Sequence, residues 1–176
     1  LGVVPTPLVP MYMLYKNALA GFMVTASHNP KDQNGIKTFC SFRGLKLLPE
    51  NDITLTRAVL SVDPLMLRKL SIKGKRINSR KEALNLFYQF SLEPRNTWVP
   101  SGRPHLFKDV ILVVDAANGS LSGIAAEIFR QVGFGKVIEV NSQLNGNVNL
   151  DSGVADLEGN TLITSNMAKK NTGLFS

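Results

Sequence analysis

Side chains that can hold and transfer a phosphate gather after a short apolar segment near the start of the chain. Ser27, His28 and Asn29 directly follow residues 21–26, and Lys37 comes soon afterwards. A serine hydroxyl can accept a phosphoryl group, imidazole and amide groups can donate hydrogen bonds to its oxygens, and a lysine can neutralise charge or move a proton. These residue types predict a site for an anion that carries a transferable group.

The turn residues nearby indicate how these groups could meet. Pro30 favours an extended Asn29, and Asn34 with Gly35 predicts a tight turn that returns Lys37 on a neighbouring strand. The same residues also fit a simple strand-to-loop turn in which serine and asparagine bond to local backbone. A Ser/His/Asp hydrolase is disfavoured, because the chain has no G-x-S-x-G elbow and its only other histidine lies in a proline-rich segment.

Two motifs in this region carry a family resemblance. Residues 25–30 read TASHNP and residues 34–37 read NGIK, and together they resemble the active-site signature of the α-D-phosphohexomutases. That family comprises phosphoglucomutases, phosphomannomutases and phosphoglucosamine mutases. Further segments that resemble the family in the expected order are residues 2–7 (GVVPTP), 44–47 (GLKL) and 113–119 (VVDAANG). The resemblance spans most of the chain, although residues 50–109 match poorly.

The resemblance implies a mechanism and a role for each residue. Ser27 would carry a phosphoryl group, give it to a hexose phosphate to form a hexose 1,6-bisphosphate, and take the other phosphate back. His28 and Asn29 would position that phosphate, and Lys37 would be the general acid/base. Mg²⁺ would bind Ser27 through its phosphate and offset charge during transfer.

The family's other metal ligands are the aspartates of a D-x-D-x-D-R loop, and this chain contains no Asp-x-Asp. We therefore expect the remaining ligands to lie outside it. The chain is interpreted as an internal fragment of a four-domain enzyme, inactive by itself.

The substrate sugar is left open between members of the family. Thr25, the first residue of the TASHNP motif that contains Ser27 (the serine motif), favours the phosphoglucomutase or phosphomannomutase type, which is the preferred interpretation. The asparagine-rich residues 145–149 and the strand at residues 37–39 favour a phosphoglucosamine mutase instead. A non-catalytic sugar-phosphate or anion-binding module is the alternative from another functional class.

Hydrophobic periodicity predicts alternating helices and strands. The expected helices are residues 8–19, ended by Gly21, and residues 54–61, 81–90, 124–132 and 156–170. The expected strands are residues 21–26, 36–40, 45–48, 110–115 and 136–140. This order predicts an α/β fold of mixed, largely parallel sheets sandwiched by helices, namely part of domain I and most of domain II of a four-domain phosphohexomutase.

Three segments are expected along the chain. Residues 1–76 would be the C-terminal part of domain I with the serine motif, residues 77–109 a connecting helix and proline-rich excursion, and residues 110–176 a βαβ part of domain II. Asp115 ends the strand of that βαβ unit, but the chain has no G-x-G-x-x-G and no P-loop, so a dinucleotide site is disfavoured. We interpret the following Asn118 and Gly119 as a structural turn.

Composition narrows the functional classes. The 176 residues are 44% hydrophobic and carry 20 Lys+Arg against 13 Asp+Glu, a net charge of +7. A basic run at residues 73–81 has little aromatic interleaving, so we expect a solvated face and no nucleic-acid partner. A single cysteine, no apolar run near the roughly 20 residues of a membrane span and no signal peptide together predict a cytoplasmic protein without a membrane partner.

Overall fold

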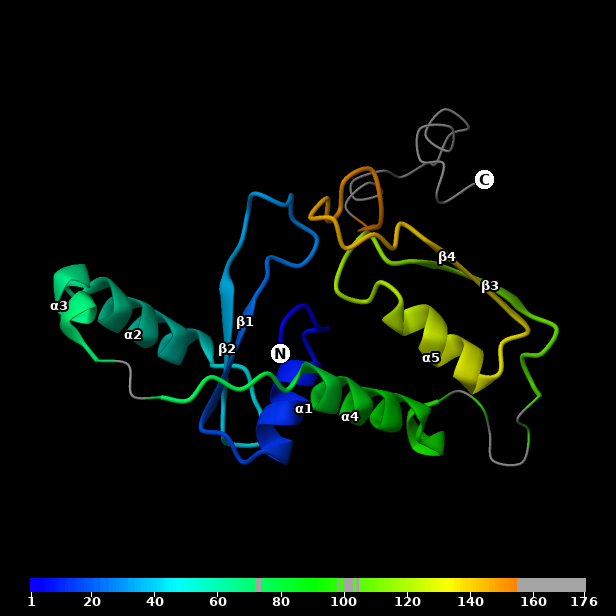
Figure 1. Ribbon diagram of the computed structural model, residues 1–176, viewed down its shortest axis with the longest axis horizontal. Helices are drawn as coiled ribbons and strands as arrows, with labels where there is room; N and C mark the ends of the chain where they lie inside the picture. Colours follow the sequence, from blue (N-terminus) through cyan, green and yellow to red (C-terminus); the bar gives the residue numbers. More distant parts are fainter. Residues whose placement is uncertain (72–73, 98, 100–102, 104, 155–176) are drawn as a thin grey trace.

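The computed structural model of the chain describes residues 1–71, 74–97, 99, 103 and 105–154 (Figure 1). In chain order its elements are α1 (Leu8–Tyr15), β1 (Ala20–Val24), β2 (Ile36–Cys40), α2 (Pro49–Leu60), α3 (Pro64–Lys69), α4 (Arg80–Leu92), the 3₁₀ helix η1 (Pro94–Asn96), β3 (Ile111–Asp115), α5 (Ile124–Val132) and β4 (Lys136–Val140). The expected helix at residues 156–170 lies outside the described residues.

The first sheet is an antiparallel pair that positions the serine motif. β1 and β2 pair from Ala20 opposite Cys40 to Val24 opposite Ile36, and α1 packs against β1. The buried cluster at this contact consists of Val4, Leu8, Val9, Tyr12, Met13, Phe39 and Ala83. Burial alternates along β1, with Phe22 and Val24 exposed. Within the described residues this strand is therefore covered on one face, which corrects the expectation of helices on both.

Gly21 sets the distance between α1 and β1. A Cβ atom at this position would lie 2.9 Å from Cγ1 of Val9 and 3.3 Å from Sδ of Met13, closer than ordinary packing allows. The expectation of a helix over residues 8–19, stopped by Gly21, is wrong in its length and in the role of the glycine. The helix ends at Tyr15, and the glycine belongs to the strand, where the absence of a side chain lets the helix approach.

α4 joins the two halves of the described structure, because it contacts both α1 and α5. Ala83 of α4 is fully buried against the α1 cluster. Beside it, Glu82 accepts hydrogen bonds from the hydroxyl of Tyr12 and from Nζ of Lys16, both at 2.5 Å. Both bonds lower the pKa of Glu82, and the bond between Lys16 and Glu82 raises the pKa of Lys16.

The second sheet confirms the predicted βαβ unit. β3 and β4 run parallel, from Ile111 opposite Lys136 to Asp115 opposite Val140, and α5 between them packs on β4. Left-handed glycines flank α5, Gly123 at its start and Gly133 at its end, as expected for residues without a Cβ. One sheet is thus antiparallel and the other parallel, so the expected largely parallel arrangement is met only in part.

Residues 45–64 differ from the expected pattern. The expected strand at residues 45–48 is reduced to one bridge between Phe39 and Lys46. α2 begins earlier than expected because Pro49 occupies its first turn. α3 was not expected from the sequence, although Asp63 caps it by accepting a hydrogen bond from the Leu65 amide and Pro64 follows. No helix in the described part of the chain combines the length and apolar character needed to cross a membrane.

Candidate active site

The serine motif lies in the long loop that joins β1 to β2. The loop is closed at its base, where the amide of Thr25 donates to the carbonyl of Gly35 at 2.9 Å. Two hydrogen-bonded turns build its tip: the Asn29 amide donates to Ala26 at 3.1 Å, and the Gln33 amide donates to Pro30 at 2.9 Å. The expected tight turn at Asn34 and Gly35 is therefore wrong. The chain reverses direction over the turns at residues 26–29 and 30–33, so the serine lies on a broad loop.

Ser27 has an uncommon backbone conformation at the start of this loop. Its φ is 58°, in the left-handed region that costs a residue with a Cβ about 1–2 kcal/mol. The Ser27 amide donates to the hydroxyl of Thr25 at 3.1 Å, a local bond that favours this turn. Strained backbone persists only where surrounding contacts hold it, and such positions concentrate at functional sites. The Ser27 side chain is exposed and open to a reactant.

Lys37 lies beside this serine, as the sequence predicted. It stands on β2 opposite Met23 of β1, and its Nζ donates to Oγ of Ser27 at 3.3 Å. A cation at this distance stabilises negative charge on a group attached to Oγ, and an amine there can exchange a proton with that oxygen. The structure thus brings these two predicted residues together.

The other two predicted residues have different surroundings. Asn29 lines the cleft described below, and its side-chain amide donates to Oε1 of Gln33 at 2.8 Å. His28 is exposed at the turn and, like Lys37, lies outside the cleft lining. The structure therefore places Ser27 and Asn29 in the cleft lining, while Lys37 contacts the serine from outside that lining.

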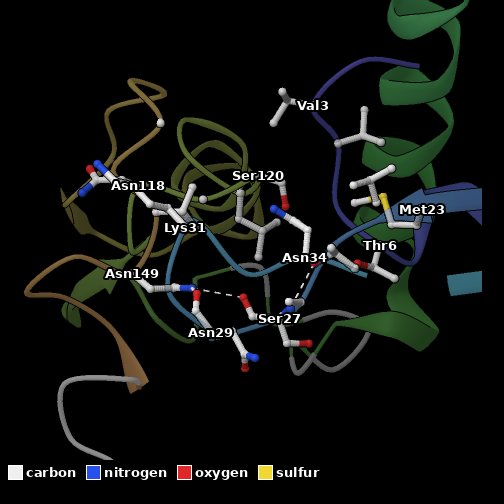
Figure 2. Close-up of a pocket in the computed structure, with 18 of the residues that line it drawn as sticks. Val3, Thr6, Met23, Ser27, Asn29, Lys31, Asn34, Asn118, Ser120 and Asn149 are labelled. Atoms are coloured by element: carbon white, nitrogen blue, oxygen red, sulfur yellow. Dashed lines mark hydrogen bonds between the residues drawn. The ribbon is translucent and has the colours of Figure 1, made fainter. Parts of the chain in front are cut away.

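A cleft of about 810 Å³ opens beside the serine loop. Figure 2 shows polar side chains from both ends of the described chain around it. Those lining it include Ser27, Asn29, Lys31, Asn34, Asn118, Ser120 and Asn149. Hydroxyl and amide groups of this kind can bind the hydroxyls of a sugar or the oxygens of a phosphate.

The far wall of the cleft comes from the asparagine-rich loop, whose residues Leu144, Gly146, Val148 and Asn149 line it. The side-chain amide of Asn149 donates to the carbonyls of Ser27, at 3.1 Å, and Asn29, at 2.9 Å. Nearby, Nζ of Lys31 donates to Oδ1 of Asn147 at 3.0 Å. The only signal in the sequence was the cluster of asparagines at residues 145–149, which does not say what they contact.

Asp115 organises this asparagine-rich loop from the end of β3. Its Oδ1 accepts from the Ala117 amide at 2.8 Å and from the Asn141 side chain at 3.2 Å, and its Oδ2 accepts from the Gly153 amide at 3.0 Å. Both oxygens of the carboxylate therefore accept hydrogen bonds that hold neighbouring segments in place. Asn118 has a similar role, since its Oδ1 accepts from the Gln143 amide at 3.0 Å, in keeping with the structural interpretation of this turn.

The described residues do not supply a metal site of their own. Within them, no three histidine, cysteine, aspartate or glutamate side chains are grouped so that they could hold an ion. Both oxygens of Asp115 already accept hydrogen bonds. Of the expected Mg²⁺ ligands, this part of the chain would supply only a phosphate oxygen, once Ser27 carries a phosphate.

Comparison with known proteins relates the chain to sugar-phosphate mutases. Residues 1–64 match the family model described as phosphoglucomutase/phosphomannomutase, alpha/beta/alpha domain I. The chain is 31% identical over 153 residues to the phosphoglucosamine mutase of Fusobacterium nucleatum, covering 86% of the chain and 32% of that protein. It is 34% identical over 163 residues to the phosphoglucosamine mutase of Pseudomonas putida, covering 90% of the chain and 33% of that protein. The chain thus spans about a third of the length of these curated relatives.

Proposed function

The chain belongs to the α-D-phosphohexomutase family, and from this premise we propose that the protein is a phosphohexomutase that interconverts hexose 1-phosphate and hexose 6-phosphate. Ser27 is the phosphoryl carrier, and a hexose 1,6-bisphosphate is the intermediate. The observation that supports this most is the 3.3 Å contact between Nζ of Lys37 and Oγ of Ser27 on a loop that borders an 810 Å³ cleft.

The chemical step follows from this contact. When the phosphorylated serine reacts, a sugar hydroxyl oxygen forms a bond to phosphorus while the bond between phosphorus and Oγ of Ser27 breaks. The Lys37 ammonium gives a proton to the leaving Oγ, and the sugar hydroxyl releases its proton to solvent. In the return step Oγ of Ser27 forms a bond to the phosphorus of the second phosphate while the bond between that phosphorus and its sugar oxygen breaks. The Lys37 amine takes the serine proton, and the leaving sugar oxygen takes a proton from solvent. The same lysine offsets the charge of the phosphate while Ser27 carries it.

The neighbouring residues assist in binding. Asn29 lines the cleft with its amide held by Gln33, so that it can donate to a phosphate oxygen with little loss of side-chain entropy. His28 has the same proposed role from the exposed turn next to the serine. Mg²⁺ is expected from family membership, and a phosphate on Ser27 would help to hold it.

The proposed sugar is glucosamine phosphate. The relatives from Fusobacterium nucleatum and Pseudomonas putida are both phosphoglucosamine mutases, and the asparagine-rich motif at residues 145–149 agrees with that type. Glucose and mannose phosphates are the second candidates, because Thr25 begins the serine motif and bonds to the Ser27 amide.

The test is phosphate uptake on Ser27 in the full-length gene product. The protein is incubated with glucosamine 1,6-bisphosphate or glucose 1,6-bisphosphate, and its intact mass is measured, followed by peptide mapping. We expect one phosphate on Ser27, none on a Ser27→Ala variant, and mutase activity only when the serine is present. Binding of hexose phosphate without phosphate transfer would support the non-catalytic module instead. Mutase activity in the Ser27→Ala variant would contradict the mechanism.

A further inference from the structure

We propose that Asn149 is a positioning residue for phosphoryl transfer: its side-chain amide holds the backbone of the serine loop so that Oγ of Ser27 stays beside Lys37. The inference rests on the proposed function of Ser27. It assigns a mechanistic role to a residue that lies 122 positions after Ser27 in the sequence.

The contact uses the full donor capacity of one amide group. Nδ2 of Asn149 carries two hydrogens, and it donates to the carbonyl of Ser27 at 3.1 Å and to the carbonyl of Asn29 at 2.9 Å. These two carbonyls flank His28, so one side chain holds both ends of this three-residue turn. Figure 2 shows Asn149 reaching the turn from the opposite wall of the cleft.

Asn149 can restrain the turn because its own backbone is held. Its amide donates to the carbonyl of Ala117 at 2.9 Å, and its side chain is half-buried. Its φ of 61° lies in the left-handed region, which asparagine tolerates better than most residues. Asp115 accepts hydrogen bonds from the amide of Ala117, to whose carbonyl Asn149 is bonded, and from the amide of Gly153 in the loop of Asn149. The amide therefore projects from a rigid support.

Ser27 needs such a restraint. Its φ of 58° is an uncommon conformation for a residue with a Cβ, and an exposed loop would relax from it without external contacts. Relaxation would move Oγ away from Lys37 and away from the position at which phosphorus is attacked. Because a displacement of about 1 Å can reduce a rate about 100-fold, loss of this restraint should slow phosphoryl transfer more than it weakens binding.

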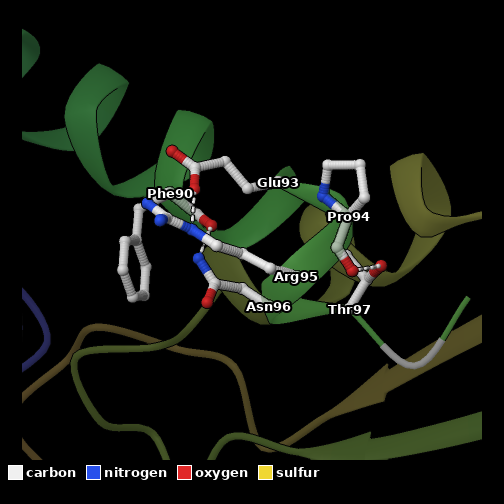
Figure 3. A network of polar contacts seen from close by, with 6 residues as sticks. All are labelled: Phe90, Glu93, Pro94, Arg95, Asn96 and Thr97. Atoms are coloured by element: carbon white, nitrogen blue, oxygen red, sulfur yellow. Dashed lines mark hydrogen bonds and ion pairs between the residues drawn. The ribbon is translucent and has the colours of Figure 1, made fainter.

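The experiment compares two variants of Asn149 with a matched control in the full-length protein. Asn149→Gly keeps the left-handed backbone and removes the amide. Asn149→Asp keeps the shape but places carboxylate oxygens against two carbonyl oxygens. The control is Asn96→Ala, because Nδ2 of Asn96 likewise donates to a backbone carbonyl, that of Phe90 at 2.7 Å, at the far end of α4 (Figure 3).

The readouts are the single-turnover rate of Ser27 phosphorylation by the bisphosphate that the wild type accepts, and amide hydrogen exchange across residues 25–33. We expect both Asn149 variants to lower the maximal rate about 10- to 100-fold, with the half-saturating bisphosphate concentration changed less than about threefold. Exchange in residues 25–33 should rise in both. Asn96→Ala should leave the rate and this exchange unchanged, even if its melting temperature falls as much as that of the Asn149 variants.

The outcomes separate the two proposals. Wild-type phosphorylation together with Asn149 variants that react as fast as Asn96→Ala would overturn the positioning role and leave the proposed function intact. A wild type that takes up no phosphate would overturn the proposed function, and with it the role of Asn149. If Asn149→Gly fails to fold, the Asn149→Asp variant decides by the same criteria.

Discussion

Nζ of Lys37 lies 3.3 Å from Oγ of Ser27 because β1 and β2 pair in one particular register. In that register Lys37 faces Met23, close to the end of the strand that leads to the serine loop. A slip of one residue would turn the lysine to the other face of the sheet. The strand pairing therefore determines whether a cation is available on the face of the sheet where the loop holds the serine.

Replacing Lys37 with Met should lower the rate of phosphoryl transfer to Ser27 by about 10²–10⁴-fold, the usual contribution of a general acid/base. Single-turnover phosphorylation followed by intact mass measures this rate. Lys69→Met, at the end of α3, is the matched control and should react at the wild-type rate. Equal rates in the two variants would remove Lys37 from the mechanism.

Replacing Ser27 with Gly should stabilise the fold relative to Ser27→Ala, although both variants lose phosphate uptake. The φ of 58° at this position favours glycine over alanine by about 1 kcal/mol. The side chain is exposed, so burial contributes little to the difference. Denaturant unfolding of the two variants measures it, and an alanine variant as stable as the glycine variant would show that the left-handed conformation carries no strain.

Replacing Asp115 with Asn should destabilise the asparagine-rich loop by about 2–3 kcal/mol. One carboxylate oxygen becomes an amide donor, so either the bond from the Ala117 amide to Oδ1 or the bond from the Gly153 amide to Oδ2 is lost. Chemical denaturation provides the measurement, with Asp109→Asn at an exposed position as the control. A change no larger than that of the control would mean that the loop keeps its shape without the carboxylate.

The contact between α1 and α4 should make stability depend on pH through Glu82. Its pKa is lowered, first by the hydrogen bond from Lys16 and then by that from Tyr12. A depressed carboxyl pKa contributes stability above the ordinary value of 4.5, and this contribution is lost as the pH falls through the depressed pKa. The raised pKa of Lys16 contributes stability that is lost only as the pH rises through it, above 10.5.

Melting temperatures from neutral pH to below 4.5 check this dependence. The melting temperature of the wild type should fall further on acidification than that of Glu82→Gln, because the variant has no charge to lose at this position. Parallel curves for the two proteins would show that the ion pair does not contribute to stability in this range.

Local signals in the sequence were sufficient for most elements. Apolar periodicity located α4 and α5 closely, and the continuous apolar runs located β3 and β4. Errors arose where a residue acts through tertiary contact. Gly21 was taken as a helix stop because a glycine's close approach to another element cannot be seen in the chain itself. α3 is the exception, since its capping aspartate and following proline were a readable local signal.

The sequence by itself determined which residue types stand at the candidate site. The residue types in the serine motif and the strand-forming segment that contains Lys37 are encoded within a few positions of each other, where turn and strand preferences act directly. Only the tertiary structure decided that the Asn149 side chain donates hydrogen bonds to the serine turn and that the asparagine-rich loop forms the far wall of the cleft. Contacts between residues this far apart depend on how α4 and the two sheets pack, and no local preference specifies that packing.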